Sequence, residues 1–217
     1  MDHADHPFHS RIHLQKNEAL SKAIAFFDFD GTITTKDSLA EFIRFSKGDW
    51  GFITGVVPAL PHFIGFKLGL ADRQKAKEKL LSVFFKGTQE NEFKEVSLAF
   101  VRDRIPLILR PGAVGKLQWH LQQGHQVVIV SASPAHWLQP WCDMNGFACI
   151  ATELEVIDHQ ISGKIAGLNC HGEEKVRRIH EKYDLSSYDT IYAYGDTEGD
   201  KPMLAISSHA FYKPFRD

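Results

Sequence analysis

The chain has 217 residues, of which 43% are hydrophobic and 24% are charged. This length fits one domain, or one domain with a sizeable insertion, and the composition excludes a disordered, collagen-like or disulfide-scaffold protein. The formal net charge is only −2, from 25 basic and 27 acidic side chains, so no broad basic surface is available for nucleic acid. An anionic substrate must therefore be bound by a local site.

The first part of the chain, residues 1–22, is polar and rich in histidine. It lacks the apolar segment of a secretory signal, so we expect a flexible tail and a cytoplasmic protein. The histidines of this tail have no further ligands beside them, and we do not expect them to bind metal. The 3 cysteines include no CxxC pair, which also fits a reducing compartment.

The first strand is predicted over residues 23–28, a continuous apolar run of the kind that is buried on both faces of a parallel sheet. This run ends in the polar segment Asp28-Phe-Asp30-Gly31-Thr32. The pattern then changes, because apolar side chains recur at helical spacing and no convincing alternating strand is found. We therefore predict a helical insertion over residues 37–106.

After the insertion, strand and helix patterns alternate. The predicted elements are strands at residues 126–130 and 190–194, helices at 113–123, 134–145, 172–183 and 198–206, and a small hairpin at 153–157 and 161–165. This alternation predicts an α/β fold with a doubly wound parallel sheet. Polar segments follow the strands, and ligands bind at the carboxyl ends of strands in such sheets, so we expect these segments to meet in one cleft.

Four acidic residues are candidates for a metal site in this cleft, namely Asp28, Asp30, Asp196 and Asp200. In an extended segment Asp28 and Asp30 share a face, or a kink presents the Asp30 carbonyl instead. Oxygen ligands of this kind suit Mg²⁺. One carboxylate can also attack a phosphate and form an aspartyl-phosphate, while a second carboxyl group protonates the leaving alkoxide and then activates water. Asp28 and Asp30 fit these two roles.

Positive charge and hydrogen-bond donors for a phosphate are also present. Lys175 supplies a compact charge near the start of a helix, and Ser131 lies just before another helix. Both residues have simpler interpretations, since Lys175 can be a solvated helix residue, and Ser131 or Ser133 can cap the helix that follows. The sequence leaves these interpretations open.

Together these segments resemble the four motifs of the haloacid dehalogenase superfamily of phosphohydrolases, in the same order: DFDGT at 28–32, Ser131-Ala-Ser133, Lys175 and GDTEGD at 195–200. The DxDGT segment after a strand is the most specific of them. The resemblance implies a phosphatase, that is, a phosphoric monoester hydrolase. It also implies a Rossmann-like core at residues 23–36 and 107–217, with a helical cap at residues 37–106.

The resemblance further implies roles for single residues. Asp28 would be the nucleophile, and Asp30 the general acid and base. Asp28, Asp196 and the Asp30 carbonyl would bind Mg²⁺, with Asp200 as a further ligand or an anchor. The implied phosphate- and substrate-binding residues are Gly31, Thr32, Asp37, Ser131, Ala132 and Lys175.

The cap type and the last motif are similar to the phosphoserine-phosphatase-like branch of this superfamily. Phosphoserine phosphatases generally have a glutamate after the first motif that contacts the substrate ammonium, and this chain has Asp37 at the corresponding place. They also commonly have DxDST where this chain has DxDGT. These differences disfavour L-phosphoserine as the substrate.

Residues 51–70 form an unusually apolar stretch for a cap. This stretch can be a pair of cap helices broken between Pro58 and Pro61 and packed on residues 80–101, or a surface that touches a membrane or accommodates lipid. The substrate would be a small phosphorylated metabolite in the first case and a lipid head-group phosphate in the second. In its apolar cap the chain also resembles phosphatidylglycerophosphate phosphatases.

Two other functions fit the same motifs. One is a phosphotransferase or mutase of the same superfamily, which would use the same aspartyl-phosphate but exclude water. The other is a non-catalytic, membrane-associated protein that binds a phosphoryl ligand, although such a protein has no need for an acid and base at Asp30.

Overall fold

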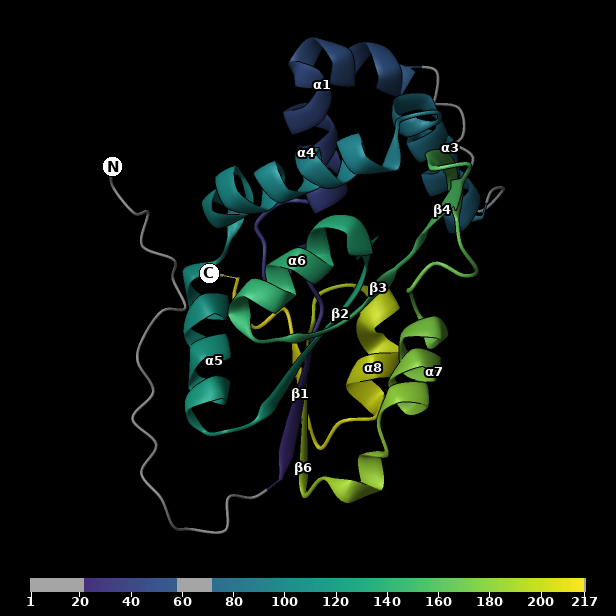
Figure 1. Ribbon diagram of the computed structural model, residues 1–217. Helices are drawn as coiled ribbons and strands as arrows, with labels where there is room; N and C mark the ends of the chain where they lie inside the picture. The colour runs from purple at the N-terminus through teal and green to yellow at the C-terminus, as the bar shows by residue number, and fades with distance from the viewer. Residues whose placement is uncertain (1–21, 58–71, 217) are drawn as a thin grey trace.

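The computed structural model describes residues 22–57 and 72–216. A sheet of five parallel strands lies at its centre, in the order β3-β2-β1-β6-β7 (Figure 1). The strands are β1 (Ala23–Phe27), β2 (Gln126–Pro134), β3 (Ala148–Thr152), β6 (Thr190–Gly195) and β7 (His209–Tyr212). Because β1 lies between β2 and β6, the polar segments that follow these three strands are neighbours at one edge of the sheet.

Helices cover both faces of this sheet (Figure 1). They are α5 (Pro111–Gln122), α6 (Ala135–Asn145), α7 (Glu173–Lys182) and α8 (Lys201–Ala205), with a single 3-10 turn η3 (Leu185–Ser187). On β1, Ala25 and Phe27 belong to the apolar core beneath α5 and α6, whereas Ile24 and Phe26 belong to the core beneath α7 and α8. Successive side chains of a strand point to opposite faces, so β1 is buried on both sides. The predicted doubly wound, Rossmann-like α/β fold is confirmed.

The segment after the first motif is helical, as expected from its pattern. It contains α1 (Ser38–Val56), α3 (Arg73–Phe85), α4 (Glu90–Asp103) and the 3-10 helix η2 (Ile105–Ile108). These helices pack on the sheet domain through Phe42, whose ring stacks on Trp137 of α6 with centroids 4.4 Å apart. Phe42 also contacts the rings of Phe85, Phe93 and Phe100, so one buried aromatic cluster joins the cap to the core.

The predicted hairpin is present as β4 (Leu154–Ile157) and β5 (Gln160–Ile165), an antiparallel pair in a sheet of its own. It packs against α3: Glu78 accepts a hydrogen bond of 3.2 Å from the Ile165 N–H, and Ser82 donates one of 3.1 Å to the Gly163 carbonyl. Gly163 has φ +83°, and a Cβ there would lie 2.6 Å from the Ser82 Cα. The sequence assigned this hairpin to the core at 107–217, but it lies against the helices of the cap.

Other differences from the predicted elements are local. Strands β3 and β7 were not predicted, and the single helix expected at 198–206 is divided into η4 (Glu198–Asp200) and α8. Most of the apolar stretch 51–70 lies outside the described residues, as do residues 1–21 of the predicted tail. Residues 51–56 continue α1. Within the described ranges, no helix is long and apolar enough to span a membrane.

Candidate active site

Asp28 is the first residue after β1, where the buried strand meets the edge of the sheet. Its N–H donates to the Tyr194 carbonyl of β6 at 2.9 Å, which fixes its backbone to the neighbouring strand. The chain then turns sharply, with the Phe29 carbonyl accepting from the N–H groups of Ile33 and Thr34. The Asp28 side chain is buried among other polar groups at the ends of the strands.

Lys175 lies in the first turn of α7 and is 1% exposed. Its ammonium donates to Asp28 Oδ1 and to Asp200 Oδ1, each at 2.6 Å. The second oxygen of Asp200 accepts from the backbone N–H groups of Asp196 and Thr197 and from the Thr197 hydroxyl. Asp200 thus anchors the loop after β6, and the interpretation of Lys175 as a solvated helix residue is wrong.

Three buried carboxylates, of Asp28, Asp196 and Asp200, each place an oxygen within 4.8 Å of the others. The Thr32 hydroxyl lies between two of them, 3.3 Å from Asp28 Oδ2 and 3.1 Å from Asp196 Oδ1. Gly31 approaches the same group: it has φ +83°, and a Cβ there would lie 2.6 Å from Asp196 Oδ2. Only glycine combines this conformation with so close an approach.

The donor set fits Mg²⁺. All of its members are hard carboxylate oxygens, and three buried negative charges exceed the single charge of Lys175. A divalent cation would neutralise that excess. Arg216, near the end of the chain, forms an ion pair with Asp196 Oδ2 and supplies part of the neutralising charge from a half-exposed position.

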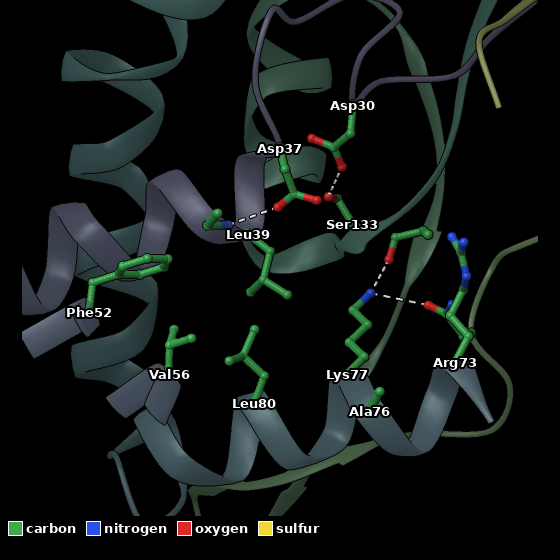
Figure 2. A pocket seen from close by; sticks show the side chains of 13 residues that line it. Asp30, Asp37, Leu39, Phe52, Val56, Arg73, Ala76, Lys77, Leu80 and Ser133 are labelled. Carbon is green, nitrogen blue, oxygen red and sulfur yellow. Dashed lines mark hydrogen bonds between the residues drawn. The ribbon is translucent and has the colours of Figure 1, made fainter. Parts of the chain in front are cut away.

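The Asp30 carboxylate points elsewhere. Oδ1 accepts from the Ser38 N–H at 2.7 Å, and Oδ2 accepts from the Ser133 hydroxyl. Among the described residues, this side chain is not part of the acidic group that can hold a metal. The sequence prediction of Asp30 as a metal ligand therefore rests on its backbone carbonyl, and its carboxyl group faces a cavity instead (Figure 2).

Burial changes the acidity of both carboxyl groups. Burial raises the pKa of Asp28 to about 7, against the opposing effect of the Lys175 charge. Burial and, next, the nearby charge of Asp37 raise the pKa of Asp30 to about 6, while hydrogen bonds from Ser133 and Ser38 oppose that rise. A carboxyl group with a pKa near 6 can both donate and accept a proton near neutral pH.

The serines at the end of β2 do not cap a helix. The N-cap of α6 is Pro134, and no side chain caps that helix. The Ser131 hydroxyl accepts from the Ser133 N–H at 3.0 Å, and the Ser133 hydroxyl reaches Asp30. Both serines thus face the polar strand ends, so the capping interpretation is wrong for each. The carbonyl of Ala132, between them, accepts a hydrogen bond from Lys77 of α3.

A cavity of about 520 Å³ opens in front of Asp30, between α1 and α3 (Figure 2). Asp37, predicted to bind substrate, lies in its wall, and its carboxylate also caps α1 by accepting from the Ala40 N–H at 2.8 Å. The motifs did not reveal Lys77 or Asn169, which line the same cavity together with Arg73. The available signal was the helical spacing of Arg73 and Lys77 beside apolar positions of α3.

Comparisons with known proteins identify the family of this chain. A model of the haloacid dehalogenase-like hydrolases matches residues 25–205. The chain belongs to this family. The predicted superfamily is confirmed. The predicted class of enzyme, a phosphatase, agrees with a hydrolase family and with the name of one relative, a probable phosphatase.

Named relatives of this haloacid dehalogenase-like hydrolase come from several bacteria. It is 36% identical to Protein CicA of Caulobacter vibrioides, over 88% of this chain and 85% of the relative. It is 28% identical to the probable phosphatase Rv3661 of Mycobacterium tuberculosis, over 88% of this chain and 68% of the relative.

Solved structures share the fold at lower identity. A protein of unknown function from Bordetella pertussis Tohama I superposes with a TM-score of 0.76 at 24% identity, covering 87% of this chain and 88% of that one. A substrate-bound phosphoserine phosphatase superposes with a TM-score of 0.64 at 16% identity, covering 90% and 86%. At these identities the likeness concerns the fold alone.

Proposed function

We propose that this chain is a Mg²⁺-dependent phosphomonoesterase that works through an aspartyl-phosphate on Asp28. The observation that carries the proposal is the convergence of a buried nucleophile candidate, a lysine and two further carboxylates, with a second carboxyl group of raised pKa beside them. When bound, Mg²⁺ supplies positive charge for the phosphoryl oxygens and for the carboxylate of Asp28. The substrate is a small phosphorylated metabolite or a lipid head-group phosphate.

In the first step, a carboxylate oxygen of Asp28 attacks phosphorus, and the bond between phosphorus and the alcohol oxygen breaks. The protonated carboxyl group of Asp30 donates its proton to the leaving alkoxide. Lys175 lies 2.6 Å from Asp28 and holds charge next to the transferred phosphoryl group, with Ser131 available as a donor from the neighbouring strand end.

In the second step, the Asp30 carboxylate takes a proton from a water molecule, which attacks the phosphorus of the aspartyl-phosphate. Inorganic phosphate leaves, and the Asp28 carboxylate is restored. Asp30 serves both steps because its hydrogen bonds from Ser38 and Ser133 hold it on the cavity side, where the alcohol leaves and water enters.

The test is acid-quenched single turnover with a ³²P-labelled phosphomonoester, in Mg²⁺ and in EDTA. We expect a base-labile phosphoenzyme and released phosphate in Mg²⁺, and neither in EDTA or in Asp28→Asn. Asp30→Asn should slow both steps by at least about 100-fold. Label transferred to added glycerol beyond its mole-fraction share would indicate a phosphotransferase instead. Binding of phosphate without any turnover would indicate a non-catalytic protein.

A further inference from the structure

We propose that the cavity in front of Asp30 selects phosphomonoesters of amphipathic alcohols, in which a second anionic group near the ester binds Lys77 and an apolar chain packs between α1 and α3. This inference rests on the proposed function, because it concerns the alcohol that the reaction releases. Lys77 is assigned as a specificity-determining residue for that alcohol.

The first argument is the unusual state of Lys77. Its ammonium donates to two neutral oxygens, the carbonyl of Ala132 and, at 3.1 Å, the side-chain oxygen of Asn169. Among the described residues, none forms an ion pair with it. Burial lowers the pKa of Lys77 to about 8, which leaves the side chain mainly charged at neutral pH. A partly buried ammonium with neutral partners can bind an anion without first breaking an ion pair.

The second argument is position. Lys175 is bonded to Asp28 and therefore lies on the nucleophile's side of the phosphoryl group. Lys77 is bonded to the residue before Ser133, whose hydroxyl contacts Asp30. Because Asp30 protonates the departing oxygen, an anion held by Lys77 belongs to the alcohol rather than to the transferred phosphoryl group. Lys175 thus contacts the phosphoryl group of the substrate, and Lys77 contacts its alcohol.

The third argument is the shape and polarity of the cavity (Figure 2). At one end, Lys77 and Arg73 rise from α3 toward Ser133. The other end is formed by apolar side chains of α1 and α3, namely Leu39, Phe52, Val56, Ala76 and Leu80. A volume of about 520 Å³ lies within the usual range for small-molecule sites. A short polar alcohol would leave the apolar end in contact with water, so an apolar chain binds better.

Asp30 and Asp37 are the acidic residues on this cavity wall, and the charge of each raises the pKa of Lys77 against the effect of burial. Asp30 is protonated when it acts as the general acid, so the charge that remains in the first step is that of Asp37. Its carboxylate accepts from the Ala40 N–H at the start of α1, where the helix dipole favours a negative charge. In the view of Figure 2 it lies between Leu39 and Ser133, above Lys77. The Ala40 N–H and the helix dipole thus offset part of the negative charge that an anion bound to Lys77 meets.

The experiment measures kcat/KM for four matched phosphomonoesters: ethyl phosphate, phosphoglycolate, octyl phosphate and 2-(phosphonooxy)octanoate. They carry neither feature, the second anion only, the chain only, or both. We expect the compound with both to exceed each compound with one by at least about 10-fold. Dihexanoyl phosphatidylglycerophosphate, below its micelle concentration, carries the same features in a lipid. Comparing it with the octanoate shows whether the alcohol comes from a lipid or from a soluble metabolite.

Variants then assign each preference to a residue. Lys77→Gln should reduce the ratio of 2-(phosphonooxy)octanoate to octyl phosphate by about 10- to 100-fold. Lys75→Gln, on an exposed position of the same helix, should leave that ratio unchanged. Val56→Thr should reduce the ratio of 2-(phosphonooxy)octanoate to phosphoglycolate by about threefold or more. Thermal unfolding of each variant controls for folding.

An unchanged anion ratio in Lys77→Gln would overturn the inference. So would an equal loss on all four compounds, because Lys77 would then contact the transferred phosphoryl group. Those results leave the proposed function standing. If no compound is hydrolysed in Mg²⁺, or if Asp28→Asn retains full turnover, the proposed function itself is wrong.

Discussion

Lys175→Met tests whether a buried ammonium stabilises the polar centre of the site. The wild-type ammonium lies 2.6 Å from both Asp28 and Asp200 and is 1% exposed, so solvent screens these pairs little. Removing one partner of a buried ion pair typically costs about 3–5 kcal/mol of unfolding free energy. For a chain of this size, about 2–4 °C of melting temperature corresponds to each kcal/mol, so a decrease of about 6–20 °C is expected.

The cause of that loss can be isolated with a double-mutant cycle, measured by urea unfolding in EDTA. If the cost arises from a carboxylate left without its counter-charge, Asp28→Asn should be less harmful in the Lys175→Met background than in the wild type, by about 1 kcal/mol or more. Lys201→Met, at an exposed position, should change stability by no more than about 0.5 kcal/mol. Strictly additive effects of the two substitutions at 28 and 175 would refute the reasoning.

Three further predictions concern other parts of the molecule. Arg216→Gln should tighten Mg²⁺ binding by about two- to fivefold in calorimetric titration, because the half-exposed guanidinium competes for Asp196; weaker binding would contradict this. Gly31→Ala should destabilise the fold by at least about 1–2 kcal/mol and weaken Mg²⁺ binding, since its φ is +83° and its Cβ would crowd Asp196; wild-type values for both would contradict this. Burial lowers the pKa of His120 to about 3. Below about pH 6.5 this histidine is therefore protonated in the unfolded chain but stays neutral in the folded chain. The unfolding free energy measured with urea should therefore fall below pH 6.5, by up to about 1.4 kcal/mol per pH unit. The loss of unfolding free energy caused by His120→Gln should be smaller at pH 5 than at pH 7. An equal loss at both pH values would show that His120 is protonated in the folded chain at pH 5.

The strand ends of the core could be predicted from the sequence because the relevant information is local. A continuous apolar run such as residues 23–27 is buried on both faces wherever it lies in a parallel sheet, and the polar residues that follow it must then lie at the carboxyl ends of the strands. Asp28 and Asp196 follow neighbouring strands, so their proximity follows from the strand order. The motif spacing and the α/β alternation together were sufficient to predict these positions.

Contacts between distant segments were harder to predict. Ser133 precedes a helix, and its local sequence is equally compatible with an N-cap; its actual partner, Asp30, lies 103 residues away in the chain. The hairpin at 154–165 has the same alternating pattern whether it packs on the core or on the cap. Its position is fixed by Glu78 and Ser82 of α3, which are more than 80 residues earlier. Local pattern does not contain this information.

The position of Lys77 depends on the local sequence, but the charge pattern alone does not reveal it. The segment that begins α3 carries basic residues at alternate positions, at 73, 75, 77 and 79, and nothing in the composition distinguishes among them. The side chain of Asp72 caps the helix, accepting from the N–H groups of Gln74 and Lys75, and so sets where it starts. At about 100° per residue, Lys77 then lies about 60° from the buried Leu80, whereas Lys75 lies about 200° from Lys77 on the opposite face. The helix phase therefore places one lysine in the cavity and its neighbour in solvent, which is why these two residues form the matched pair for testing substrate selection.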